Sequence, residues 1–198
     1  MTIALYLTFS RILLSPLFLI VYLYGQSLGL SFLLIPIILL FLAIISELSD
    51  IFDGLLARKY NQVTQLGKLA DPMADSIVRI SAFFTFTQGV VELPLGLVFI
   101  FLYRDSIIST LRTLCALRGV TLSARFSGKV KAVLQGAAII FILILMLFYA
   151  MGGISLGLLK SASYYSVLAV AIYTIYSGIE YIYANRSHIL PALTSSSR

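Results

Sequence analysis

The sequence predicts an all-α polytopic membrane protein with six transmembrane helices and both termini in the cytoplasm. Of its 198 residues, 60% are hydrophobic and only 11% are charged, whereas soluble domains carry about 25% charged residues. Its apolar runs reach the roughly 20 residues that a helix needs to cross a hydrocarbon core of about 30 Å. Its lysines and arginines gather on alternate connections between these runs, as the positive-inside rule requires of a multi-pass protein.

Six apolar segments define the predicted helices in order. Arg11 lies inside the first segment, and no small-residue cleavage site follows it, so we expect a membrane span rather than a signal peptide. Pro16, Pro36 and Pro94 do not exclude helices, because neighbouring helices of a bundle can satisfy a freed carbonyl group. The segments span about 6–25, 30–57, 70–89, 94–117, 131–152 and 161–184.

The distribution of positive charge predicts the orientation, because cytoplasmic connections carry an excess of lysine and arginine. We expect one domain over residues 1–185 and a short polar tail at 186–198. The non-cytoplasmic side receives only Lys160 and the acidic Glu92. This bias accounts for the net charge of +6, so no nucleic-acid partner is needed to explain it. We expect the protein to lie in a bacterial inner (cytoplasmic) membrane. The cytoplasmic side receives Arg58, Lys59, Lys68, Arg118, Arg125, Lys129, Lys131, Arg186 and Arg198.

Half of the eight acidic residues lie in one short stretch, as Asp50, Asp53, Asp71 and Asp75. Their spacings place each pair on one face of a helix, and the short connection between the pairs predicts antiparallel neighbouring helices. Four carboxylates near a bilayer repel one another and are costly to bury, so a cation must compensate them. Ligands that are all oxygen suit Mg²⁺ or Mn²⁺ rather than zinc. Four carboxylates suffice for a pair of such ions, as in phosphoryl transfer.

Helix capping and ion transport are two other interpretations of the aspartates. Asp71, which precedes Pro72, fits a helix N-cap, but Asp50 and Asp53 lie towards the end of their helix, where the helix dipole disfavours negative charge. A cation transporter also places carboxylates in its spans. Transporters more often place them near the midplane of repeated halves, and this chain has no such repeat.

The same stretch resembles the signature of the CDP-alcohol phosphatidyltransferases. It reads Asp50-x-x-Asp53-Gly54-x-x-Ala57-Arg58, then eight residues, then Gly67-x-x-x-Asp71-x-x-x-Asp75, and all eight fixed positions match. The resemblance implies a six-helix membrane enzyme, usually a homodimer. Such an enzyme uses two divalent cations, Mg²⁺ or Mn²⁺, to displace CMP from a CDP-linked lipid with an alcohol.

The resemblance also implies roles for the matched residues. Asp50, Asp53, Asp71 and Asp75 would bind the metal ions, and Asp75 would be the catalytic base that deprotonates the acceptor hydroxyl. The site for the cytidine diphosphate group would be formed by Asp50, Gly54, Ala57, Arg58 and Gly67.

The fourth and fifth segments predict an anionic acceptor. Arg104 and Arg112 share roughly one face of a helix, and arginines inside spans usually face a polar interior. Lys129 and Lys131 follow at the start of the fifth segment. The alternative is that Arg104 is neutralised by Asp105 or Glu47. Adjacent helical residues point about 100° apart, so we do not expect Arg104 to pair with Asp105.

The stretches from Thr2 to Pro16 and from Tyr103 to Gln135 are similar to the bacterial phosphatidylglycerophosphate synthases. This similarity implies transfer of a phosphatidyl group from CDP-diacylglycerol to glycerol 3-phosphate in the membrane. The acceptor phosphate would be bound by Arg104, Arg112, Lys129 and Lys131. An inositol-phosphate acceptor stays open, since it too requires a basic site.

The chain departs from this subfamily at three places. The asparagine that usually opens the subfamily is replaced by the stretch from Thr2 to Ala4. Ser76 stands where a lysine usually follows the fourth aspartate, and Arg79, one turn later, is a candidate for the missing cation. Glu47 stands one turn before Asp50, where a small apolar residue is expected, and we expect it to pair with an arginine.

Overall fold

The computed structural model describes residues 3–59, 65–117, 119–120, 122 and 125–189, with side chains described for 12–49 and from residue 73 onwards within these ranges. Six long helices account for nearly all of this part of the chain, which contains no strand. The predicted all-helical fold is therefore confirmed. The helices are α1 (Ile3–Tyr24), α2 (Leu34–Lys59), α3 (Gln65–Thr85), α4 (Leu95–Leu117), α5 (Phe126–Ala150) and α6 (Leu156–Ala184).

The observed helices match the six predicted segments, with ends that differ by a few residues, and α3 and α5 extend into polar sequence. α3, α5 and α6 each begin about five residues before the predicted apolar segment. Hydropathy marks only the apolar part of a helix, whereas the backbone hydrogen bonds continue through polar flanks. Among the described residues, α5 and α6 are long and apolar enough to cross a membrane. The six-span topology and its orientation stay predictions.

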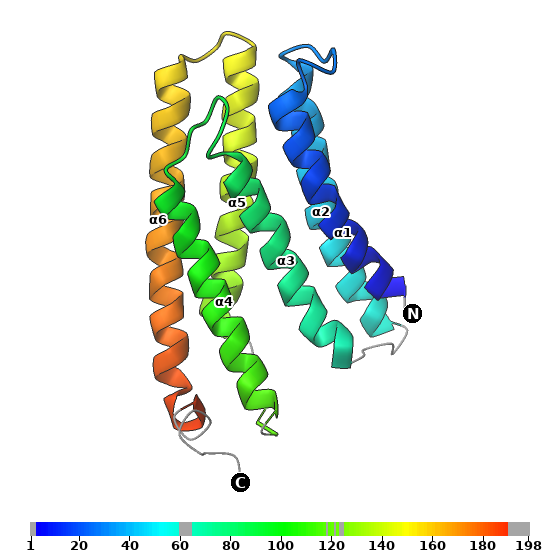
Figure 1. Ribbon diagram of the computed structural model, residues 1–198, viewed down its shortest axis with the longest axis vertical. Helices are drawn as coiled ribbons and strands as arrows, with labels where there is room; N and C mark the ends of the chain where they lie inside the picture. The colour runs from blue at the N-terminus through cyan, green and yellow to red at the C-terminus, as the bar shows by residue number, and fades with distance from the viewer. Residues whose placement is uncertain (1–2, 60–64, 118, 121, 123–124, 190–198) are drawn as a thin grey trace.

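The helices run alternately up and down the bundle, so that residues far apart in the sequence meet at one end (Figure 1). The start of α1, the end of α2 and the start of α3 lie towards the same end as the end of α4, the start of α5 and the end of α6. At the opposite end, Gly152 adopts a left-handed conformation with φ 76° after α5. Ser155 then caps α6 by accepting a hydrogen bond from the Leu158 N–H at 3.3 Å.

The neighbours of each helix follow from its contacts among the described residues. α1 packs on both helices, and α5 packs on α2, on α3 and most extensively on α6. α4 packs on α3 and α6. Among the described residues, α1 and α5 each contact both α2 and α3. One ion pair between Glu47 and Arg79 joins α2 to α3.

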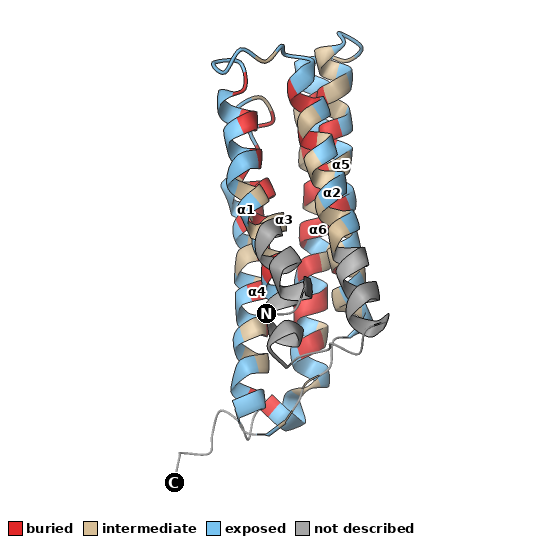
Figure 2. Ribbon diagram, turned by 90° about the vertical axis from the view of Figure 1, so that its right-hand side faces the viewer, coloured by how far each residue is buried: buried red, intermediate tan, exposed pale blue. Residues whose placement is uncertain are grey.

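The buried residues follow the faces that the helices turn towards one another (Figure 2). Many residues on the outer faces are large and hydrophobic as well. Phe83, Phe86 and Phe101 are fully buried at the centre of the core. Ile172 and Ile179 are among many large hydrophobic side chains that are exposed on α6. An outer surface of this kind suits a hydrocarbon environment better than water, in agreement with the composition.

Candidate active site

The aspartate signature lies at the end of the bundle where α2 finishes and α3 begins. The backbone is helical at Asp50 and Asp53 in α2 and at Asp71 and Asp75 in α3, so each pair has the spacing of one helix face, as predicted. The Asp75 side chain is half-buried and takes part in an interaction within the protein. The predicted site roles of seven residues depend on side chains that lie outside the described set, namely those of Asp50, Asp53, Gly54, Ala57, Arg58, Gly67 and Asp71.

A divalent metal site fits the chemistry of this donor set, which is all carboxylate. The described side chains contain no group of three or more histidine, cysteine, aspartate or glutamate residues that could hold a metal ion. Three of the four candidate ligands are outside that set, so the predicted metal site stays a prediction. The helical backbone on both sides of the α2–α3 connection is what the predicted two-helix ligand arrangement requires.

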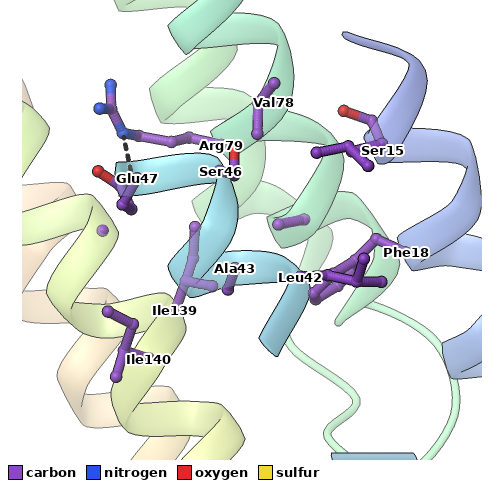
Figure 3. Close-up of a pocket in the computed structure, with 13 residues that line it drawn as sticks. Ser15, Phe18, Leu42, Ala43, Ser46, Glu47, Val78, Arg79, Ile139 and Ile140 are labelled. Carbon is purple, nitrogen blue, oxygen red and sulfur yellow. Dashed lines mark ion pairs between the residues drawn. The ribbon is translucent and has the colours of Figure 1, made fainter. Parts of the chain in front are cut away.

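One turn further into the bundle, an ion pair joins the two helices that carry the aspartates. The Arg79 Nε atom lies 3.5 Å from the Glu47 Oε1 atom (Figure 3). Glu47 precedes Asp50 by three residues and Arg79 follows Asp75 by four, so the pair lies about one helical turn from the signature on both sides. The expectation that Glu47 pairs with an arginine is confirmed. Gly136 on α5 accommodates the carboxylate, because a Cβ atom there would lie 3.0 Å from Glu47 Oε1.

A small pocket of about 40 Å³ adjoins this ion pair between α1, α2, α3 and α5. Glu47 and Arg79 face each other on one side, and Ser15 and Phe18 come from α1 across the pocket (Figure 3). The Ser15 Oγ atom is buried and has no hydrogen-bond partner in the described part of the chain. Most of the remaining lining is apolar, namely Leu14, Leu42, Ala43, Val78, Ala82, Ile139 and Ile140.

A buried charged cluster lies between α3, α4 and α5 and is formed by Ser76, Arg104, Asp105 and Lys131; we call it the Asp105 cluster. Lys131 Nζ donates to Asp105 Oδ1 and Oδ2, both at 2.8 Å. Arg104 Nη1 donates to Asp105 Oδ1 at 3.0 Å, and Ser76 Oγ donates to Asp105 Oδ2 at 2.9 Å. Asp105 and Lys131 are only 7% and 4% exposed, so these charges are almost fully removed from solvent.

The expectation that Arg104 and Asp105 do not pair was wrong. Their Cβ atoms do diverge on the helix, but a long arginine side chain can fold back over its own helix to reach the neighbouring carboxylate. Glycines on two other helices make room for it. A Cβ atom at Gly178 on α6 would lie 3.1 Å from Arg104 Cγ, and one at Gly128 on α5 would lie 3.5 Å from Arg104 Nη2.

The four predicted acceptor-binding cations occupy three different environments. Arg104 and Lys131 belong to the Asp105 cluster. Arg112 donates through Nε to the hydroxyl of Tyr181 at 3.2 Å, and its guanidinium lies over that ring. Arg104 and Arg112 therefore both face α6, as their spacing predicts. Lys129 is exposed, because two residues along a helix turn it about 200° away from Lys131.

Glu180, which was not among the predicted site residues, links α5 to α6 near Gly128. Glu180 Oε1 pairs with Arg125 Nε at 2.5 Å, and Glu180 Oε2 accepts from Ser127 Oγ at 2.6 Å. The contact fixes the start of α5 against the end of α6, next to Gly128. An acidic residue late in an apolar helix is the signal that could have drawn attention to it. Ile189, within the predicted tail, is also buried, against Cys115 on α4.

The charges of the described site leave a positive surplus. Within the Asp105 cluster, Arg104 and Lys131 face one carboxylate, and among the described residues Arg112 contacts the hydroxyl of Tyr181. The Glu47–Arg79 pair is neutral. The Nε atom of Arg104 is buried and has no hydrogen-bond partner among the described residues. An anion is the kind of ligand that this surplus and this unsatisfied donor favour.

Comparisons with known proteins agree with the motif. A family model described as CDP-alcohol phosphatidyltransferase matches residues 1–177. A CDP-diacylglycerol–glycerol-3-phosphate 3-phosphatidyltransferase from Salmonella typhimurium is 31% identical over 193 residues, covering 93% of this chain and 94% of the relative. A Rickettsia typhi protein of the same name is 32% identical over 132 residues, covering 66% and 69%. A probable phosphatidylglycerophosphate synthase from Mycobacterium tuberculosis is 30% identical over 177 residues, covering 89% and 78%.

Proposed function

The chain belongs to the CDP-alcohol phosphatidyltransferase family, and from this premise we propose that it transfers a phosphatidyl group from CDP-diacylglycerol to glycerol 3-phosphate, with release of CMP. The choice of acceptor rests on the Asp105 cluster. This cluster carries more positive than negative charge, and one of its members directly follows Asp75 in the sequence. Ser76, the neighbour of Asp75 in α3, donates a hydrogen bond to Asp105. A phosphorylated alcohol bound at these cations is thereby close to the candidate base.

The proposed reaction is a displacement at phosphorus. The primary hydroxyl oxygen of glycerol 3-phosphate forms a bond to the lipid-bearing β-phosphorus, and the bond from that phosphorus to the bridging oxygen of CMP breaks. A carboxylate oxygen of Asp75 accepts the hydroxyl proton, and CMP leaves with the bridging oxygen. Most of the rate acceleration in such a transfer comes from positioning and charge stabilisation.

Enzymes of this family generally use a divalent metal. In this chain Asp50, Asp53, Asp71 and Asp75 would hold two such ions, Mg²⁺ or Mn²⁺, which would supply positive charge at the pyrophosphate. Beside them, the lack of bulky side chains at Gly54, Ala57 and Gly67 would let the cytidine diphosphate group approach the backbone closely. Arg58 would bind a phosphate oxygen.

The acceptor site would use Arg104, Arg112, Lys129 and Lys131 as its cations. Arg104 is best suited to bind the acceptor phosphate, because its buried Nε atom has no hydrogen-bond partner among the described residues. Arg112 faces the same neighbouring helix at a distance of two turns. Lys129 is exposed and would attract the anion from the cytoplasm rather than hold it.

We further propose that the domain of residues 1–185 crosses a bacterial cytoplasmic membrane six times, with the aspartates facing the cytoplasm. α6 ends on the side of the bundle where α2 ends and α3 begins (Figure 1), and the positive charge is predicted to gather on that side. A soluble phosphorylated alcohol would then meet the lipid-linked nucleotide at the membrane surface. A homodimer is the expected assembly for this family.

Release of CMP by the purified full-length protein tests the proposed function. CDP-diacylglycerol and Mg²⁺ are supplied with glycerol 3-phosphate, inositol phosphate, inositol or serine in separate reactions. We expect turnover with glycerol 3-phosphate, loss of turnover with EDTA, and loss in Asp75→Asn. Turnover only with inositol phosphate would retain the chemistry and refute the acceptor. Absence of turnover in every reaction of well-folded protein would refute the transferase and favour ion transport.

A further inference from the structure

We propose that Asp105 is a positioning residue for the acceptor site: it holds the cationic groups of Arg104 and Lys131 in one arrangement beside the helix that carries Asp75. The proposal rests on the proposed function, because it names a residue that acts on the binding of the phosphorylated acceptor. Asp105 itself, being an anion, would not touch that substrate.

The geometry of the carboxylate is the first argument. Both Asp105 oxygens accept two hydrogen bonds each from donors on three helices, at distances from 2.8 to 3.0 Å. Lys131 comes from α5, Ser76 from α3, and Arg104 from α4 itself. A flexible ammonium group and a flexible guanidinium group are thereby held at defined positions, which a binding site for a small anion requires.

The charge of the cluster is the second argument. A carboxylate that served only to neutralise Lys131 would need no further cation, yet Arg104 contacts the same Oδ1 atom. Among the described side chains of the cluster, two positive groups contact one carboxylate, which leaves a surplus in a region that is largely closed to water. A buried surplus charge is costly until a counter-ion arrives. The unsatisfied Arg104 Nε atom identifies where one polar contact remains to be made.

The connection to Asp75 is the third argument. Ser76 replaces the lysine expected after the fourth aspartate, and its hydroxyl is bound to Asp105 rather than exposed to a substrate. The residue next to the candidate base is therefore anchored to the same carboxylate as Arg104 and Lys131. A change at Asp105 would disturb the distance between the acceptor phosphate and the base, and not the nucleotide side of the site.

Steady-state kinetics with both substrates varied provide the test. For Asp105→Asn we expect the KM for glycerol 3-phosphate to rise about 10- to 100-fold, because small displacements of binding groups have effects of this size. The KM for CDP-diacylglycerol should stay within about twofold, a range equivalent to less than half a kcal/mol. Asp105→Glu restores the negative charge and should recover part of the loss. Glu92→Gln, which removes a carboxylate from an exposed pair with Lys160 at the opposite end, is the matched control.

A second variant separates positioning from folding. Asp105→Asn leaves two buried cations without a counter-charge, so it can lower the melting temperature as well. The double variant Asp105→Asn/Lys131→Met removes one of these cations and should regain much of the melting temperature, while its KM for glycerol 3-phosphate stays high. Recovery of the wild-type KM in the double variant would overturn the proposal, as would an unchanged KM in folded Asp105→Asn.

The wild-type reactions distinguish this proposal from the function on which it rests. If wild-type protein turns over with glycerol 3-phosphate and the variants keep their acceptor KM, the positioning role is refuted and the function stands. If the wild-type protein shows no turnover with any of the acceptors, the function itself is refuted and the positioning role with it. Ser76→Ala, which removes one of the four hydrogen bonds, should raise the same KM by less than Asp105→Asn does.

Discussion

Glu47→Gln and Arg79→Met each remove one charge from the ion pair between α2 and α3, and the structure predicts unequal losses of stability. The Arg79 side chain is 11% exposed and that of Glu47 is 39% exposed. Without Glu47, a nearly buried guanidinium loses its counter-charge. Without Arg79, the remaining carboxylate can be hydrated, and methionine preserves the apolar part of the arginine side chain. Glu47→Gln should therefore be the more destabilising change.

The magnitudes follow from burial. Breaking a fully buried pair costs about 3–5 kcal/mol, and an exposed pair contributes about 0.2–1 kcal/mol. This pair lies between the two cases, and its 3.5 Å separation is long for a charged hydrogen bond. We expect a loss of about 2 kcal/mol for Glu47→Gln and about 1 kcal/mol for Arg79→Met. With a coupling energy of about 1 kcal/mol, the double variant should lose about 2 kcal/mol rather than 3.

Thermal unfolding in detergent measures these differences. A loss of 1 kcal/mol lowers the melting temperature of a protein of this size by about 2–4 °C. Glu47→Gln should then lower it by about 4–8 °C and Arg79→Met by about 2–4 °C, with the double variant close to Glu47→Gln. Glu92→Gln, in the exposed pair with Lys160, should change it by less than about 4 °C. A larger loss for Arg79→Met than for Glu47→Gln, or strictly additive losses, would refute the reasoning.

Three further predictions concern other parts of the molecule. Gly89→Ala should destabilise the protein by about 1–3 kcal/mol in a thermal or denaturant melt, because Gly89 has φ 68° and a Cβ atom there would lie 2.8 Å from the Tyr22 ring. Gly178→Ala should raise the KM for the acceptor more than that for the lipid, because its Cβ atom would lie 3.1 Å from Arg104 Cγ; equal changes in both values would contradict this. Asp53→Asn should weaken Mn²⁺ binding, measured from the electron paramagnetic resonance signal of free Mn²⁺, by about tenfold or more, and unaltered binding would exclude it as a ligand.

Much of the site was predictable because its residues are close together in the sequence. The spacing of Asp50 from Asp53 and of Asp71 from Asp75 specifies a shared helix face once the segments are helical, and helical backbone is observed at all four. The unusual Glu47 could also be expected to need a cation, because a carboxylate in an apolar helix is costly when it is unpaired. Its arginine partner, Arg79, was already a candidate cation one turn beyond Asp75.

The partners of Asp105 were not predictable in this way. Lys131 is 26 residues away from it and Ser76 is 29 residues away, and no local spacing connects residues on three different helices. The one local inference about Asp105, that Arg104 would point away from it, failed because it considered the direction of the Cβ atoms and not the reach of the arginine side chain. Gly128 and Gly178 allow that reach, and their relevance depends on how α4, α5 and α6 pack.

Composition, apolar segment length and residue spacing thus established the helical class, the approximate helix bounds and the aspartate signature of this chain. These properties follow from local geometry and from the transfer of side chains out of water, both of which can be evaluated along a single helix. The pairing of Asp105 with Lys131, the placement of Arg112 against Tyr181 and the link between Glu180 and α5 depend on packing. Each of them requires two or more helices to be brought together, because a buried charge takes its partner from whichever helix lies opposite.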